Sequence, residues 1–160
     1  MTVVVDSSAL ITLARIGRLE LPHQIAGDVH IPAAVFVEVV QRGGGRAGTV
    51  EVAGATWIHR RDARDVTSVG RLGTRVGRGE AEAIVLAKEL GADILVIDDA
   101  VARRVAEAEG QRVVGLTGLL IHGKEQGVVA EIKPVLDSMR AAGFFLDDSR
   151  YESLLRRAGE

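Results

Sequence analysis

The chain has 160 residues, a formal net charge of −2 and no cysteine. Its length suits one domain, which we expect to span residues 1–160, and the lack of cysteine excludes disulfides, thiolate metal sites and a cysteine nucleophile. The apolar runs are too short to cross a bilayer, which predicts a soluble cytoplasmic protein. The net charge excludes a strongly basic surface overall, and the aromatic content of 3% excludes a surface that stacks bases.

Short apolar runs alternate with helical patterns along the chain. The first half predicts, in chain order, a strand at residues 3–5, a helix after Asp6 that Gly17 ends, a strand at 28–31, a helix with Pro32 in its first turn, a short helix at 47–53, a strand at 56–58 and a brief helix at 66–72. The second half predicts a helix at 80–90, a strand at 94–97, a helix at 101–109, a strand at 112–114 and helices at 117–126, 131–142 and 149–157. This alternation indicates the α/β class, with a mainly parallel sheet covered by helices on both faces.

One long stretch breaks the alternation. Residues 59–79 are rich in arginine and glycine and show little periodicity, so we expect them to be flexible apart from the brief helix. Arginines outnumber aspartates there, which allows a local basic surface.

Carboxylates follow two of the predicted strands. Asp6 ends the first strand, and Asp98 and Asp99 end the strand at 94–97. Ligands of open α/β sheets bind beyond the carboxyl ends of the strands. If these two strands are neighbours, their acids converge and need a cation to offset their repulsion. Carboxylate ligands favour hard ions, here Mg²⁺ or Mn²⁺.

Three glutamates on predicted helices extend this set. Glu38 lies in the apolar run after Pro32, so it faces either solvent or a site. Glu80 and Glu82 start the helix at 80–90, where a helix N-terminus favours negative charge. Residues two apart do not share a helix face, so both serve one metal only if Glu80 lies at the cap. Each acid also has an ordinary alternative, as a helix cap or a solvated side chain, and their coincidence favours a site.

Four segments, in this order, resemble the motifs of PIN domains. They are Val-Val-Asp6-Ser7-Ser8-Ala-Leu-Ile, Pro32-Ala-Ala-Val-Phe-Val-Glu38-Val-Val, Gly79-Glu80-Ala-Glu82-Ala-Ile and Val96-Ile-Asp98-Asp99-Ala-Val-Ala-Arg103. Further similarity to a prokaryotic PIN-like subfamily lies in Gly115-Leu-Thr-Gly118-Leu-Leu, Lys124-Glu-Gln-Gly127 and Ala158-Gly-Glu160, so the resemblance covers essentially the whole chain.

The resemblance implies a PIN-like three-layer sandwich and a Mg²⁺- or Mn²⁺-dependent endoribonuclease, similar to the VapC-like toxins of toxin–antitoxin pairs. Metals held by carboxylates activate water and stabilise the charge on the scissile phosphate, so no histidine base is needed. The implied partners are RNA, a small antitoxin protein and a second copy of the chain. The implied catalytic and metal-binding residues are Asp6, Glu38, Glu80, Glu82, Asp98 and Asp99.

The third motif departs from the family pattern. Typical PIN toxins place an aspartate there, whereas this chain has Gly-Glu-Ala-Glu, a variant that resembles flap endonucleases. Either Glu80 or Glu82 could therefore be the main metal ligand of the third motif. Either Asp98 or Asp99 could be that of the fourth motif, where the alignment of strand ends favours Asp99.

Substrate contacts are expected beside the acids. Ser7 and Ser8 can hydrogen-bond metal-bound water or phosphate, and Arg75 and Arg78, just before the acidic helix, are predicted to contact RNA phosphates. The alternative for the arginines is a solvated loop.

Three other functions are alternatives to a nuclease. The run Ile-Leu-Val-Ile-Asp98-Asp99 also resembles the first strand of a response-regulator receiver domain, but too little chain follows for its remaining strands. A dinucleotide site would need Gly-x-Gly-x-x-Gly after the first strand, and this is absent. The alternative that stands is a non-catalytic PIN-like module that binds RNA or a protein.

Overall fold

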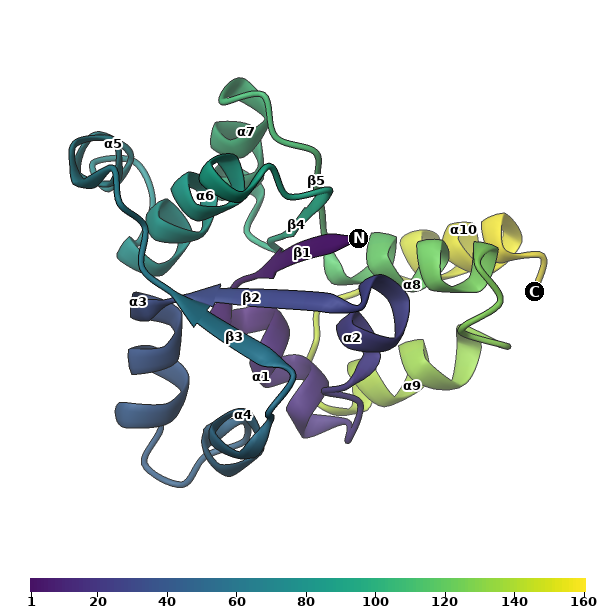
Figure 1. The fold of residues 1–160 in the computed structure, drawn as a ribbon. Coiled ribbons are helices and arrows are strands. Elements are labelled where there is room, and N and C mark those ends of the chain that lie inside the picture. Colours follow the sequence, from purple (N-terminus) through teal and green to yellow (C-terminus); the bar gives the residue numbers. More distant parts are fainter.

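A sheet of parallel strands runs through the middle of the computed structural model, which describes residues 1–160 (Figure 1). The strands are β1 (Thr2–Val5), β2 (Asp28–Pro32), β3 (Ile58–Arg61), β4 (Ile94–Val96) and β5 (Val113–Val114), in the order β3-β2-β1-β4-β5. All neighbouring strands pair in parallel. The predicted α/β class is confirmed, and β1 lies between β2 and β4 as the convergence of the acids requires.

Helices cover both faces of this sheet (Figure 1). They are α1 (Ser7–Arg15), α2 (Leu21–Ala26), α3 (Ala33–Phe36), α4 (Thr49–Gly54), α5 (Val66–Leu72), α6 (Arg78–Leu90), α7 (Ala100–Ala108), α8 (Leu116–Glu125), α9 (Lys133–Ala141) and α10 (Asp148–Ala158). Helix α3 continues into a π-helical turn, η1 (Val37–Gln41). No helix is both long enough and apolar enough to cross a membrane.

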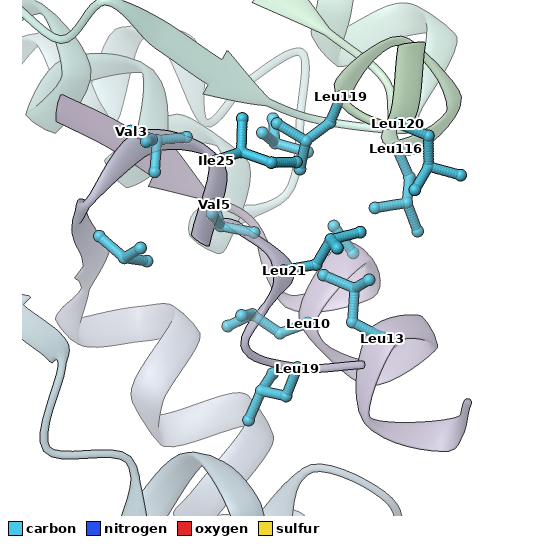
Figure 2. Packing of buried hydrophobic residues seen from close by; sticks show 14 of the residues in the cluster. Val3, Val5, Leu10, Leu13, Leu19, Leu21, Ile25, Leu116, Leu119 and Leu120 are labelled. Atoms are coloured by element: carbon cyan, nitrogen blue, oxygen red, sulfur yellow. The ribbon is translucent and has the colours of Figure 1, made fainter. Parts of the chain in front are cut away.

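The alternation of side chains along the strands divides the core into two clusters. Val3 and Val5 of β1 pack against α1, α2 and α8, as Figure 2 shows with Leu10 and Leu13 of α1. Val4, on the other face of the same strand, joins the cluster that α6 and α7 form. Because both faces are covered, residues 3–5 of β1 are all apolar, and the buried Asp6 is the first polar residue after them.

Three local predictions were wrong. Helix α2 was missed because six residues are too few to show a helical period. Pro32 ends β2 and stands at the N-cap of α3 in extended geometry, with ψ of 162°, rather than in the first turn of the helix. Residues 59–61, expected to be flexible, belong to β3. Their side chains are polar and exposed, so the sequence shows no apolar strand pattern, and the strand forms by pairing with β2.

Glu160 contacts two of the C-terminal helices, α8 and α9, through its carboxylate. The Glu160 carboxylate accepts hydrogen bonds from the backbone N–H groups of Ile132 at 2.8 Å and Lys133 at 3.1 Å. Both groups lie at the N-terminus of α9, where backbone donors lack helical partners. Lys124 of α8 adds an ion pair at 2.9 Å. The Ala-Gly-Glu segment therefore joins α8, α9 and α10.

Replacing Glu160 with alanine is expected to destabilise the fold by about 1–3 kcal/mol, because two backbone donors lose their acceptor and Lys124 loses its ion-pair partner. The measurement is urea denaturation followed by circular dichroism. Glu152→Ala is the matched control, since Glu152 is an exposed acid of α10. Equal midpoints for the two variants would contradict this role of Glu160.

Candidate functional site

Two aspartates meet at the carboxyl ends of β1 and β4. Asp6 directly follows β1 and is 2% exposed, and Asp98 lies two residues beyond β4. The strands are in register at Val5 and Val96, and the Asp6 backbone N–H donates to the Val96 carbonyl at 3.1 Å. Burial, then the negative charges of Asp98 and Glu80, raise the pKa of Asp6 to about 7, although hydrogen bonds oppose this. The structure thus brings these three acids together.

The hydrogen bonds of this aspartate pair leave one oxygen without a partner. Asp6 accepts from the Ala9 backbone N–H at 3.0 Å, so it caps α1, and from the Ser8 hydroxyl at 3.3 Å. Asp98 Oδ1 accepts from the Leu116 backbone N–H at 2.8 Å. Asp98 Oδ2 is buried and has no hydrogen-bond partner. A buried carboxylate oxygen without a donor is costly unless a proton or a cation compensates it.

Glu80 and Asp99 each hold the start of a helix beside this pair. Glu80 accepts from the Gly77 backbone N–H at 2.7 Å, and Asp99 accepts from the Ala102 backbone N–H at 2.8 Å. The capping alternative is therefore present for both. They also line one cavity of about 440 Å³, together with Arg75. The cavity adjoins the aspartate pair through Glu80, whose charge reaches Asp6.

Glu38 is directed toward the same edge of the sheet from η1. It accepts a hydrogen bond from the hydroxyl of Ser7, the residue that follows Asp6. A β-carbon on Gly79 would lie 3.4 Å from Glu38 Oε2, so the glycine lets the start of α6 approach this carboxylate. A π-helical turn is rare and is often found at functional sites, because it displaces the side chains that follow it.

Glu82 lies with Glu38 rather than with Glu80. It is buried, accepts from the Ala34 backbone N–H at 2.8 Å and pairs with Arg78 at 3.1 Å. A cavity of about 300 Å³ lies between Glu38 and Glu82. The two glutamates of the third motif thus face different neighbours, as their spacing of two residues requires.

The six acids therefore form two groups on one edge of the sheet. Asp6, Asp98 and Glu80 make one group, with Asp99 at its rim, and Glu38 and Glu82 make the other. No three acidic or histidine side chains are arranged so that they could enclose a metal ion as they stand. The atoms that do fit a divalent cation are the unpartnered Asp98 Oδ2 and the buried carboxylate of Asp6.

A family model described as a PIN domain matches residues 2–160. The chain belongs to the PIN-domain family. None of the curated proteins compared with it matches the chain. PIN domains are generally nucleases that bind nucleic acid and use divalent metals, so membership supports a hydrolase of phosphodiester bonds at this coarse level.

The four substrate-binding residues predicted for this PIN domain have different surroundings. Ser7 and Ser8 hydrogen-bond Glu38 and Asp6, so they hold carboxylates in place. Arg78 is ion-paired with Glu82, whereas Arg75 lines the cavity beside Asp99. Their contacts with RNA stay a prediction.

Sequence reasoning overlooked two residues next to Asp98. Arg103 of α7 and Gly115, the N-cap of α8, both lie beside its carboxylate. The available signals were their places in two of the PIN-like segments, at the end of the fourth motif and at the start of the Gly-Leu-Thr-Gly run. Neither position carries an acid, so a pattern of metal-ligating residues does not include them.

Proposed function

We propose that this PIN domain is a Mg²⁺- or Mn²⁺-dependent endoribonuclease and the toxin of a type II toxin–antitoxin pair. The observation that carries the proposal is the Asp6–Asp98 pair, two carboxylates at adjacent strand ends with one buried oxygen lacking a partner. Burial and mutual repulsion disfavour two negative charges there, and a divalent cation relieves both. Mg²⁺ and Mn²⁺ suit such all-oxygen ligands.

The chain's own residues prepare this site for a cation. The backbone N–H group of Ala9 fixes the Asp6 carboxylate, and that of Leu116 fixes the Asp98 carboxylate. Glu80 can join them by giving up its hydrogen bond to Gly77, since its side chain lies at the first turn of α6. When bound, the metal lowers the pKa of a coordinated water and stabilises the charge on the scissile phosphate.

The finer parts of the proposal rest on the resemblance of the four motifs. They favour RNA as the substrate and a small antitoxin as the partner, whose arginine would pair with the carboxylates and so block the site. We further propose that residues 1–160 act as one nuclease domain, as a homodimer in the cytoplasm. Copurification with the product of an adjacent gene tests the antitoxin, and light scattering tests the dimer.

The first test of the function is cleavage of a mixed RNA substrate by the purified protein in Mn²⁺, Mg²⁺ or EDTA. We expect fragments of defined length in either metal and intact RNA in EDTA. Single-stranded DNA serves as the comparison substrate and should be cut more slowly. Intact RNA in both metals, with a panel of tRNAs also intact, would overturn the nuclease assignment.

One observation favours the alternative of a non-catalytic binding module. Glu38, Glu80, Glu82 and Asp99 are all engaged in hydrogen bonds within the chain, as they would be if they served only the fold. Tight metal binding or RNA binding without cleavage would support this alternative. Isothermal titration with Mn²⁺, run beside the cleavage assay, separates the two.

A further inference from the structure

Arg103 reaches the edge of the site from the first turns of α7. It lies one helical turn after Asp99, the N-cap of that helix. A β-carbon on Gly115 would lie 2.8 Å from Arg103 Nη1 and 2.9 Å from Asp98 Oδ1, so the guanidinium and the carboxylate flank the same small space. Any larger residue at position 115 would push one of them away.

The donors of Arg103 are free. Three more exposed arginines are paired, in Arg71–Glu109, Arg78–Glu82 and Arg140–Asp148. The Arg103 guanidinium takes part in no hydrogen bond or ion pair, and none of its nitrogen atoms is buried without a partner, so they face solvent. The residue as a whole is partly buried. Its stem is thus held by packing while its N–H groups remain available.

Arg103 is not simply the counter-ion of Asp98. The two side chains form no ion pair within 4.0 Å, and Asp98 Oδ1 is already taken by the Leu116 backbone N–H. Burial raises the pKa of Asp98, while the Leu116 hydrogen bond and then the charges of Arg103 and Arg150 oppose it. Arg150, an exposed residue of α10, therefore adds a second positive charge on this side of the pair.

We propose that Arg103, in the space that Gly115 leaves, binds a phosphate group of the nucleic-acid substrate beside the Asp6–Asp98 pair. A guanidinium presents parallel N–H donors that match the oxygens of a phosphate, and its charge offsets the repulsion between that phosphate and the carboxylates. The identity of the anion rests on the proposed function. Arg103 would orient the substrate backbone on the β5 side of the site, opposite to Arg78.

The test measures RNA binding without cleavage. Fluorescence anisotropy with a labelled single-stranded RNA in EDTA is recorded from low to moderate salt for the wild-type chain, Arg103→Gln and Arg104→Gln. Arg104 is the matched control, because it is the next residue of α7 and is exposed. We expect Arg103→Gln to weaken binding about tenfold and to reduce the slope of log K against log salt by about 0.7, the value for one phosphate contact on a single strand. Arg104→Gln should change neither.

Arg103→Lys is a second variant that keeps the positive charge. Circular dichroism shows whether each variant is folded. Lysine keeps the charge without the planar fork, so the salt slope should stay near that of wild type while affinity falls less than in the glutamine variant. Equal effects of Arg103→Gln and Arg104→Gln, or no binding by the wild-type chain, would overturn the proposal. If the wild-type chain cleaves RNA but Arg103→Gln has the same salt slope as wild type, the phosphate site at Arg103 is rejected and the nuclease function stands. If RNA binding depends on Arg103 but no metal supports cleavage, the nuclease function is rejected and the phosphate site stands.

Discussion

Replacing Asp6 with asparagine is expected to reduce the rate of RNA cleavage by about 10³-fold or more, because the variant loses a negatively charged metal ligand at the centre of the site. Asparagine keeps the shape of the side chain and can still cap α1 through the Ala9 N–H. Cleavage in saturating Mn²⁺ is the measurement. Asp62→Asn is the control, because Asp62 is exposed and lies outside the group of acids. Activity of Asp6→Asn within tenfold of wild type would exclude Asp6 as a ligand.

The same substitution should stabilise the metal-free protein at high pH. Because the pKa of Asp6 is raised from 3.8 to about 7 in the fold, folding stability falls as the pH rises between these two values, and the loss is complete above pH 7. Asparagine carries no charge, so the variant does not lose this part of the free energy of unfolding, which is about 1–4 kcal/mol. Thermal unfolding in EDTA should therefore show a higher midpoint for Asp6→Asn than for wild type at pH 8.

At pH 5 the two midpoints should differ less than at pH 8, because only the part of the loss between pH 3.8 and pH 5 is then present. Equal midpoints at both pH values would show that burial of this carboxylate carries no penalty. Mn²⁺ should raise the midpoint of the wild-type chain far more than that of Asp6→Asn, since only a ligand that binds the folded state stabilises it. A loss of activity with a gain of stability is what distinguishes a functional buried charge from a structural one.

The convergence of Asp6 and Asp98 was predictable because it depends on a simple rule. Apolar runs with no polar interruption predict buried parallel strands, and the first polar residue after each run marks the edge where ligands bind. The spacing of Glu80 and Glu82 likewise indicated that they cannot share one face, and the structure separates them. Strand order itself does not follow from the sequence, since nothing local in residues 3–5 or 94–97 sets which strands are neighbours.

Details that depend on one residue of register were not predictable. Strand β4 ends at Val96 and α7 begins at Ala100, each one residue earlier than the periodicity suggested. The Asp99 backbone is extended, and its carboxylate turns back to the start of α7. The π-helical turn that carries Glu38 has no period of its own in the sequence. The free guanidinium of Arg103 depends on a glycine at 115, which only the fold brings near.

The second large effect concerns the two adjacent aspartates. We expect Asp98→Asn to lower kcat by about 10²–10³-fold and Asp99→Asn to stay within about tenfold of wild type. Asp98 is the partner of Asp6 and carries the unpartnered oxygen, whereas Asp99 is exposed and already occupied as the cap of α7. Asparagine caps a helix about as well as aspartate does, so Asp99→Asn should keep α7 intact.

Three measurements make this comparison decisive. Asp99→Ala should lower stability by about 1 kcal/mol through loss of the cap, which separates its structural role from catalysis. Titration with Mn²⁺ should show weakened binding for Asp98→Asn and near wild-type binding for Asp99→Asn. A larger loss of kcat in Asp99→Asn than in Asp98→Asn would mean that the metal draws Asp99 away from its cap. The alignment of strand ends, which favoured Asp99, would then identify the ligand better than the contacts of the metal-free fold.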